Sequence, residues 1–175
     1  LLRIRFEYDA TAWVGLAFAY LLAERWLASR LSPVGRGAGG EGWLKLFRWP
    51  LGVGSVLLCA LGLLLTAPGT LSAFVGLPVE QYVPILLAQS AALAFSIVAA
   101  RLYRSRWPAY FITPLAFVPV TVFFIGYGAR LFGRALTDPE YALVWMGLAL
   151  IHLSLAALLD RSKVRYSHGL YLGGY

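Results

Sequence analysis

The chain has 175 residues, of which 60% are hydrophobic and 13% are charged, and its formal net charge is +7. An average soluble domain has about 25% charged residues, so this composition excludes an ordinary soluble globule and indicates a membrane protein. The positive charge does not indicate nucleic-acid binding, because the basic residues form short clusters at the ends of apolar stretches and do not cover one soluble face.

Five apolar stretches have the length of a membrane-spanning helix. The hydrocarbon core of a bilayer is about 30 Å thick and needs roughly 20 residues of helix. A sixth apolar segment begins near Gly169 and is cut off at Tyr175. The sequence therefore predicts an all-α, polytopic transmembrane bundle with five full spans and a truncated sixth, the second span being short and rich in glycine. The full spans are expected at residues 10–27, 51–66, 83–102, 109–127 and 141–159.

We expect residues 1–175 to be a single membrane domain fragment of a longer protein. The first residue is leucine and not an initiator methionine, and the residues that follow lack the order of a signal peptide. Abundant Ala, Leu, Gly and Arg with little Lys favours a bacterial coding sequence of high GC content.

A tandem repeat organises the predicted bundle. Arg48-Trp49-Pro50 and Arg106-Trp107-Pro108 each precede an apolar span, and Arg165-Tyr166-Ser167 follows about 59 residues later. Each unit is a helical hairpin with a basic turn, and proline suits the first turn of the second helix because its missing N–H would be unpaired there anyway. Repeat proteins stack such units on their neighbours. The units are expected at approximately residues 8–70, 79–135 and 138–175, the last one incomplete, with residues 32–42 as a glycine-rich loop insertion.

Basic residues are concentrated in the turns of the hairpins. Eleven of the fifteen Lys and Arg residues lie in residues 25–48, 101–106 and 161–165. Cytoplasmic loops of membrane proteins carry an excess of Lys and Arg. The sequence therefore predicts a multi-pass protein of the cell membrane, with these turns in the cytoplasm and the start of the fragment outside.

The Arg-aromatic pairs are expected at the lipid headgroups, because amphipathic rings and long basic side chains settle in that layer. The expected partners are a bilayer with anionic headgroups and either other membrane subunits or the missing remainder of the chain, and not nucleic acid. The residues expected at the interface are Arg48, Trp49, Arg106, Trp107, Arg165 and Tyr166.

Glu24 is a candidate because a charged group is costly inside a bilayer. It lies at the predicted cytoplasmic end of the first span. Snorkelling of its side chain and pairing with Arg25, Arg30 or Tyr20 would explain it without a function.

Gln89 in the third span and Thr113 in the fourth are the other polar candidates. Such side chains either join helices by hydrogen bonds or, together with Glu24, line a polar path. Pro114 and Pro119 should kink the fourth span by removing two backbone donors. That kink either shapes the bundle or lines a pathway.

His152 is predicted to lie near the middle of the fifth span. A buried histidine either donates a hydrogen bond to a neighbouring helix or serves a cofactor such as haem or chlorin. The positions that correspond to it in the repeat, Leu93 and Tyr20, are not ligands of the same kind. The pattern favours the hydrogen bond and predicts no metal site, with a cofactor as the alternative.

The sequence contains no G-x-S-x-G, H-E-x-x-H or cysteine pair. A non-catalytic membrane subunit or scaffold region is therefore the favoured function. One alternative is a fragment of a transporter, channel or flippase, and another is a haem or pigment subunit that uses His152. A third is a membrane-embedded enzyme acting on lipid-linked sugar, for which the candidate carboxylates on the outer side are Glu7, Asp9, Asp138 and Glu140.

Overall fold

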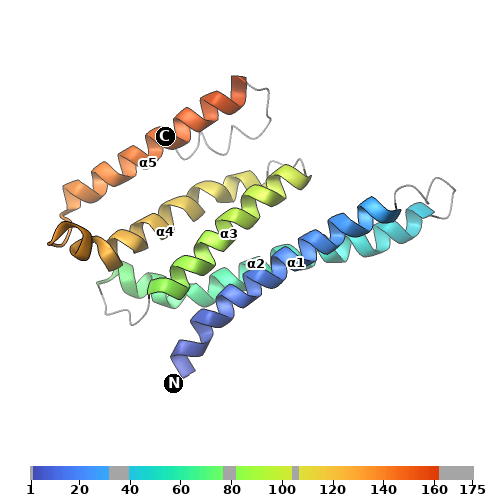
Figure 1. Ribbon diagram of the computed structural model, residues 1–175, viewed down its shortest axis with the longest axis horizontal. Coiled ribbons are helices and arrows are strands. Elements are labelled where there is room, and N and C mark those ends of the chain that lie inside the picture. Colours follow the sequence, from blue (N-terminus) through green and yellow to red (C-terminus); the bar gives the residue numbers. More distant parts are fainter. Residues whose placement is uncertain (1, 32–39, 77–81, 104–106, 162–175) are drawn as a thin grey trace.

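The computed structural model describes residues 2–31, 40–76, 82–103 and 107–161, and every regular element in these ranges is an α-helix. The expected all-α architecture is confirmed for them (Figure 1). The helices are α1 (Leu2–Leu31), α2 (Gly40–Phe74), α3 (Tyr82–Tyr103), α4 (Trp107–Phe132) and α5 (Asp138–Arg161).

Four stretches of the described residues are long and apolar enough to cross a membrane. They are Pro50–Phe74, Tyr82–Tyr103, Tyr110–Phe132 and Asp138–Leu158. Their length and composition support the prediction of a multi-pass helical membrane protein. Helix α1 is not among the four, and its crossing of the membrane stays a prediction. The predicted sixth segment lies outside the described residues.

The helices form two hairpins and one outer helix (Figure 1). Helix α1 makes its most extensive contact with α2, and α3 makes its own with α4. Helix α3 also packs on both α1 and α2, which joins the two hairpins. Among the described elements α5 contacts α4 alone. The equivalence of the hairpins as sequence repeats stays a prediction.

Helix α2 is longer at both ends than the sequence predicted. It begins at Gly40, inside the predicted loop at residues 32–42, and continues through Pro50 and Pro68. The expectations that Pro50 opens a helix and that the second span is short are therefore wrong, whereas Pro108 does lie in the first turn of α4. A proline removes only one backbone donor, and an apolar surrounding favours keeping all other backbone hydrogen bonds within the helix.

Helices α1 and α2 approach each other closely at Gly62. A Cβ atom built on this glycine would lie 2.6 Å from Val14 Cγ2 and 2.9 Å from the backbone oxygen of Ala10. Gly126 of α4 makes room for the ring of Tyr82 on α3, since a Cβ there would lie 2.6 Å from Tyr82 Cγ. Small residues let helices approach each other closely, which is a main source of helix association in membranes.

We expect Gly62→Ala to destabilise the bundle by about 1–3 kcal/mol, because the added methyl group forces α1 and α2 apart. The matched control is Gly147→Ala on α5, where no atom lies within 4 Å of the added Cβ. Alanine has a better helix propensity than glycine by about 1 kcal/mol, so the control should be neutral or slightly stabilising. Thermal unfolding in detergent micelles measures both, and equal effects would contradict the close approach.

Candidate functional site

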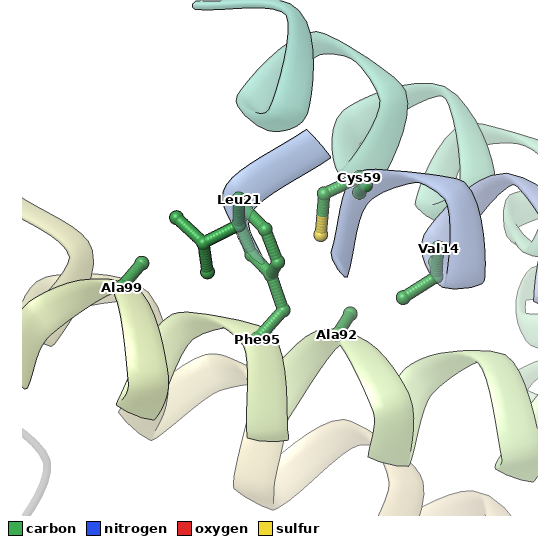
Figure 2. Close-up of a cluster of buried hydrophobic side chains, with 7 residues drawn as sticks. Val14, Leu21, Cys59, Ala92, Phe95 and Ala99 are labelled. Atoms are coloured by element: carbon green, nitrogen blue, oxygen red, sulfur yellow. The ribbon is translucent and has the colours of Figure 1, made fainter. Parts of the chain in front are cut away.

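Apolar side chains fill the interior shared by α1, α2 and α3 (Figure 2). Val14 of α1 lies beside Ala92 of α3, and Leu21 lies near Phe95 and Ala99 one to two turns further along. The buried members of this apolar layer are Val14, Ala17, Leu21, Cys59, Ala92, Phe95 and Ala99. The layer separates two groups of buried polar side chains, one at each of its ends.

The first polar group surrounds Glu24 of α1, which is only 6% exposed. The hydroxyl of Tyr103 on α3 donates a hydrogen bond to Glu24 Oε2. Gly52 of α2 makes room for this pair, since a Cβ there would lie 3.2 Å from the Tyr103 hydroxyl and 3.6 Å from Glu24 Oε2. Three helices thus enclose the carboxylate. The side chain turns into the bundle and bonds to α3, which differs from the snorkelling expected from the sequence. Its pairing with Arg25, Arg30 or Tyr20 stays a prediction.

The second polar group joins α2 to α3 through Gln89, which is 3% exposed. Gln89 Nε2 donates to Thr70 Oγ1 at 2.8 Å. Thr70 Oγ1 in turn donates to the backbone oxygen of Thr66 at 2.9 Å, and Thr66 Oγ1 donates to the backbone oxygen of Leu63 at 2.7 Å. The role of Gln89 in joining helices, one of its two predicted roles, is therefore observed.

Two residues of the predicted polar path, Gln89 and Glu24, lie far apart. Gln89 and Tyr103, the partner of Glu24, are separated by fourteen positions of α3, which is about 21 Å along a helix axis. Thr113 lies on α4 and is half-buried. The apolar layer lies between Gln89 and Glu24, so a path through all three residues stays a prediction.

His152 of α5 is 4% exposed, and its ring lies 5.5 Å from the ring of Phe117 on α4. Its Nδ1 atom is 2.8 Å from the backbone oxygen of Leu148. A carbonyl oxygen only accepts, so Nδ1 is the donor of this hydrogen bond. This hydrogen bond runs within α5 and not to a neighbouring helix, which differs from the sequence-based expectation.

Trp145 makes a side-chain hydrogen bond between α4 and α5. Its Nε1 atom donates to Thr121 Oγ1 at 2.9 Å, and Thr121 Oγ1 donates to the backbone oxygen of Phe117 at 2.8 Å. Trp145 thus makes the hydrogen bond to a neighbouring helix that the sequence analysis expected of His152. An indole N–H needs such a partner when it is removed from water.

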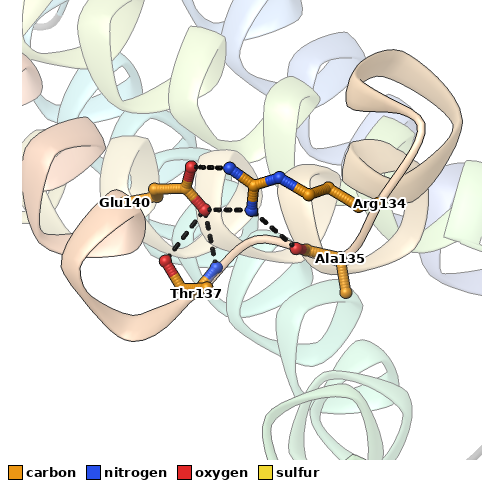
Figure 3. Close-up of polar contacts among 4 residues, drawn as sticks. All are labelled: Arg134, Ala135, Thr137 and Glu140. Atoms are coloured by element: carbon orange, nitrogen blue, oxygen red, sulfur yellow. Dashed lines mark hydrogen bonds and ion pairs between the residues drawn. The ribbon is translucent and has the colours of Figure 1, made fainter.

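Glu140 caps the start of α5 (Figure 3). Its Oε2 atom accepts hydrogen bonds from the backbone nitrogen of Thr137 at 2.8 Å and from Thr137 Oγ1 at 2.9 Å. Arg134 holds both carboxylate oxygens, with its Nη1 atom 2.8 Å from Glu140 Oε2. This bonding raises the pKa of the Arg134 guanidinium above its ordinary value. Glu140 is thus engaged in a helix cap, while the side chain of Glu7 lies outside those that the structure describes.

None of the six predicted interface side chains is among those that the structure describes. Arg106, Arg165 and Tyr166 lie outside the described residues, as do the side chains of Arg48, Trp49 and Trp107. Their contact with lipid headgroups stays a prediction.

The described residues contain no group of three or more His, Cys, Asp or Glu side chains placed to hold a metal ion. No family model matches the sequence, and comparison with curated proteins and with solved structures finds no match.

We expect Tyr103→Phe to destabilise the bundle by about 1–3 kcal/mol, because it removes the hydroxyl that bonds to a buried carboxylate. Tyr20→Phe is the control, since Tyr20 is 39% exposed and lies against Gly54 with its ring. Chemical unfolding in mixed micelles compares the two variants. Equal stabilities would show that the Glu24 carboxylate does not depend on Tyr103.

Proposed function

We propose that this chain is a non-catalytic membrane subunit or scaffold region, whose helices assemble with other helices in the bilayer. The observation that carries the proposal is the position of α5, which contacts only α4 among the described elements. Its partners in the assembly are other membrane subunits or the remainder of its own chain.

The exposed surface of α5 supports this proposal. Large apolar side chains lie on its free sides, and the most exposed are Leu143, Met146, Leu150, Ile151 and Leu158. Lipid tails are as apolar as these side chains, so helix association in a bilayer depends on close packing and on hydrogen bonds between helices. Helix α5 has little of either with α4, and further helices packed on its free sides would supply the contact that α4 does not.

The proposed location is the cell membrane, with the basic connections between hairpin helices in the cytoplasm. The asymmetry of Lys and Arg supports this orientation by the positive-inside rule. In this orientation Glu24 and Tyr103 lie toward the cytoplasmic side, and Gln89 and Thr70 lie toward the outer side.

A second candidate function, binding of haem or a chlorin, is favoured by the geometry of His152. Histidines that ligate a metal usually donate their other ring N–H to a backbone carbonyl or a carboxylate, which fixes the tautomer. The bond from Nδ1 to the Leu148 carbonyl has this form. Nε2 of His152 would then be the ligating atom.

We expect photo-crosslinking residues at Met146 and Leu150 of α5 to give the same crosslinked protein partner in native membranes, because both side chains are exposed on the surface of α5. The matched control is Leu64 of α2, whose side chain is 66% exposed, close to 61% for Met146 and 63% for Leu150. Leu64 should label lipid, because α2 already packs on α1, α3 and α4. Mass spectrometry identifies the products, and labelling of lipid alone at all three sites would contradict the proposal.

A scaffold also predicts that natively purified protein has no Soret or chlorin absorption band and that His152→Leu assembles as the unchanged chain does. Absorption spectroscopy and size-exclusion chromatography measure the two properties. The control variant is His168→Leu, at the other histidine of the sequence. An absorption band that His152→Leu abolishes and His168→Leu retains would replace the scaffold with the cofactor-binding function.

A further inference from the structure

Two buried side-chain oxygens in the described part of the chain have no hydrogen-bond partner. They are Oγ1 of Thr11 on α1 and Oε1 of Gln89 on α3. Gln89 as a whole is 97% buried, so bulk water does not reach its amide. Buried polar atoms are nearly always paired with protein or with ordered water, and two exceptions in one small bundle need an explanation.

The hydrogen bonds around Gln89 fix which way its amide points. The hydroxyl proton of Thr70 is directed to the Thr66 carbonyl, so Thr70 Oγ1 can only accept from Gln89. The amide end that faces Thr70 is therefore the NH₂ group, and Oε1 faces away from it. Thr66 donates its own hydroxyl proton to the Leu63 carbonyl. Neither threonine of α2 has a proton left for Gln89 Oε1.

The register of α1 on α3 brings Thr11 to the level of Gln89. Glu24 bonds to Tyr103, 79 positions further along the sequence, and Val14 lies beside Ala92, 78 positions further along (Figure 2). The same offset pairs Thr11 with Gln89, one turn beyond Val14 and Ala92. This register places Thr11 and Gln89 at one level of the interface between α1 and α3.

We propose that a single enclosed water molecule bridges Thr11 Oγ1 and Gln89 Oε1. A hydroxyl rotates freely, so a direct bond would form if the two oxygens were within reach, and its absence indicates a gap between them. Water fills such a gap and donates to Gln89 Oε1, while it pairs with Thr11 Oγ1 through a second proton or a lone pair.

A water molecule fits this position better than a cation. A monovalent ion here would need a nearby carboxylate to offset the cost of burying its charge. Glu24 is at the opposite end of the apolar layer, and Asp9, two residues before Thr11, is exposed. The other described groups near Gln89 are neutral: Thr11, Thr66 and Thr70 with Ile85 and Ala88. Ile85, Ala88 and Ala92 of α3 are 0% exposed, so they shield this position from bulk water. The enclosed water therefore exchanges slowly.

Nuclear magnetic resonance of the protein in lipid bicelles tests the proposal at one assigned group. The sequence has no asparagine and only two glutamines, Gln81 and Gln89. In a Gln81→Glu chain labelled with ¹⁵N, the single side-chain amide signal therefore belongs to Gln89. We expect its protons to show a dipolar cross-peak to a long-lived water. Absence of this cross-peak from the spectrum of the Gln81→Glu chain would overturn the proposal.

Variants of Thr11 show whether the water forms the bridge. Thr11→Val, which removes the hydroxyl with little change of volume, should abolish the cross-peak, and Thr11→Ser should retain it. Ser154→Ala on α5, which also removes a hydroxyl, is the control and should leave the cross-peak unchanged. A cross-peak that survives Thr11→Val overturns the bridge. If Thr11→Val does not fold, the cross-peak in the Gln81→Glu chain alone decides the proposal.

Replacing choline chloride by sodium chloride tests whether a cation occupies the position. A shift of the Gln89 amide signal on this exchange would overturn the proposed water in favour of a cation.

Discussion

The close approach of α1 to α2 at Gly62 is the contact on which the rest of the described bundle depends. Without a side chain at this position, Val14 and the backbone of Ala10 lie directly against α2. Helix α3 can then pack on both helices at once, which brings Ala92 and Ala99 to the apolar layer. The positions of both polar groups follow from this arrangement, because each joins α3 to one of the two helices below it.

The two ends of the bundle use different chemistry for the same purpose. At one end a carboxylate of α1 accepts a hydrogen bond from a tyrosine of α3, and at the other an amide of α3 donates to a threonine of α2. Each bond would be costly to break in an apolar medium, because its partners have no bulk water to replace it. The two bonds therefore fix the register of α3 along α1 and α2. Apolar contacts alone specify this register poorly.

Much of the fold follows from the sequence, because a run of about 20 apolar residues has few stable conformations other than a membrane-spanning helix. The positions of α3, α4 and α5 were predicted to within a few residues. Pro50 misled the prediction of where α2 begins, since proline commonly stands at a helix end in water but is tolerated inside a helix that is shielded from it.

The pairing of particular side chains was less accessible. Tyr103 and Glu24 are 79 positions apart, and nothing in the sequence gives the register of one helix on another. For the same reason the partners of Gln89 and Trp145 were not predicted. The helix cap at Glu140 differs, because Thr137-Asp138-Pro139-Glu140 matches a known pattern for the start of a helix, and attention to that local motif would have found it.

The short connection between α4 and α5 gives the outer helix a fixed direction that does not depend on packing. Gly133 ends α4 with a φ of +71°, which favours glycine, and Arg134, Thr137 and Glu140 then tie the next residues to the first turn of α5. A helix whose orientation is fixed before association loses less conformational entropy when a neighbour docks on it. The arginine and glutamate of this connection would thereby strengthen an assembly without touching any partner, so their effect would appear in the association constant and not in the list of interface residues.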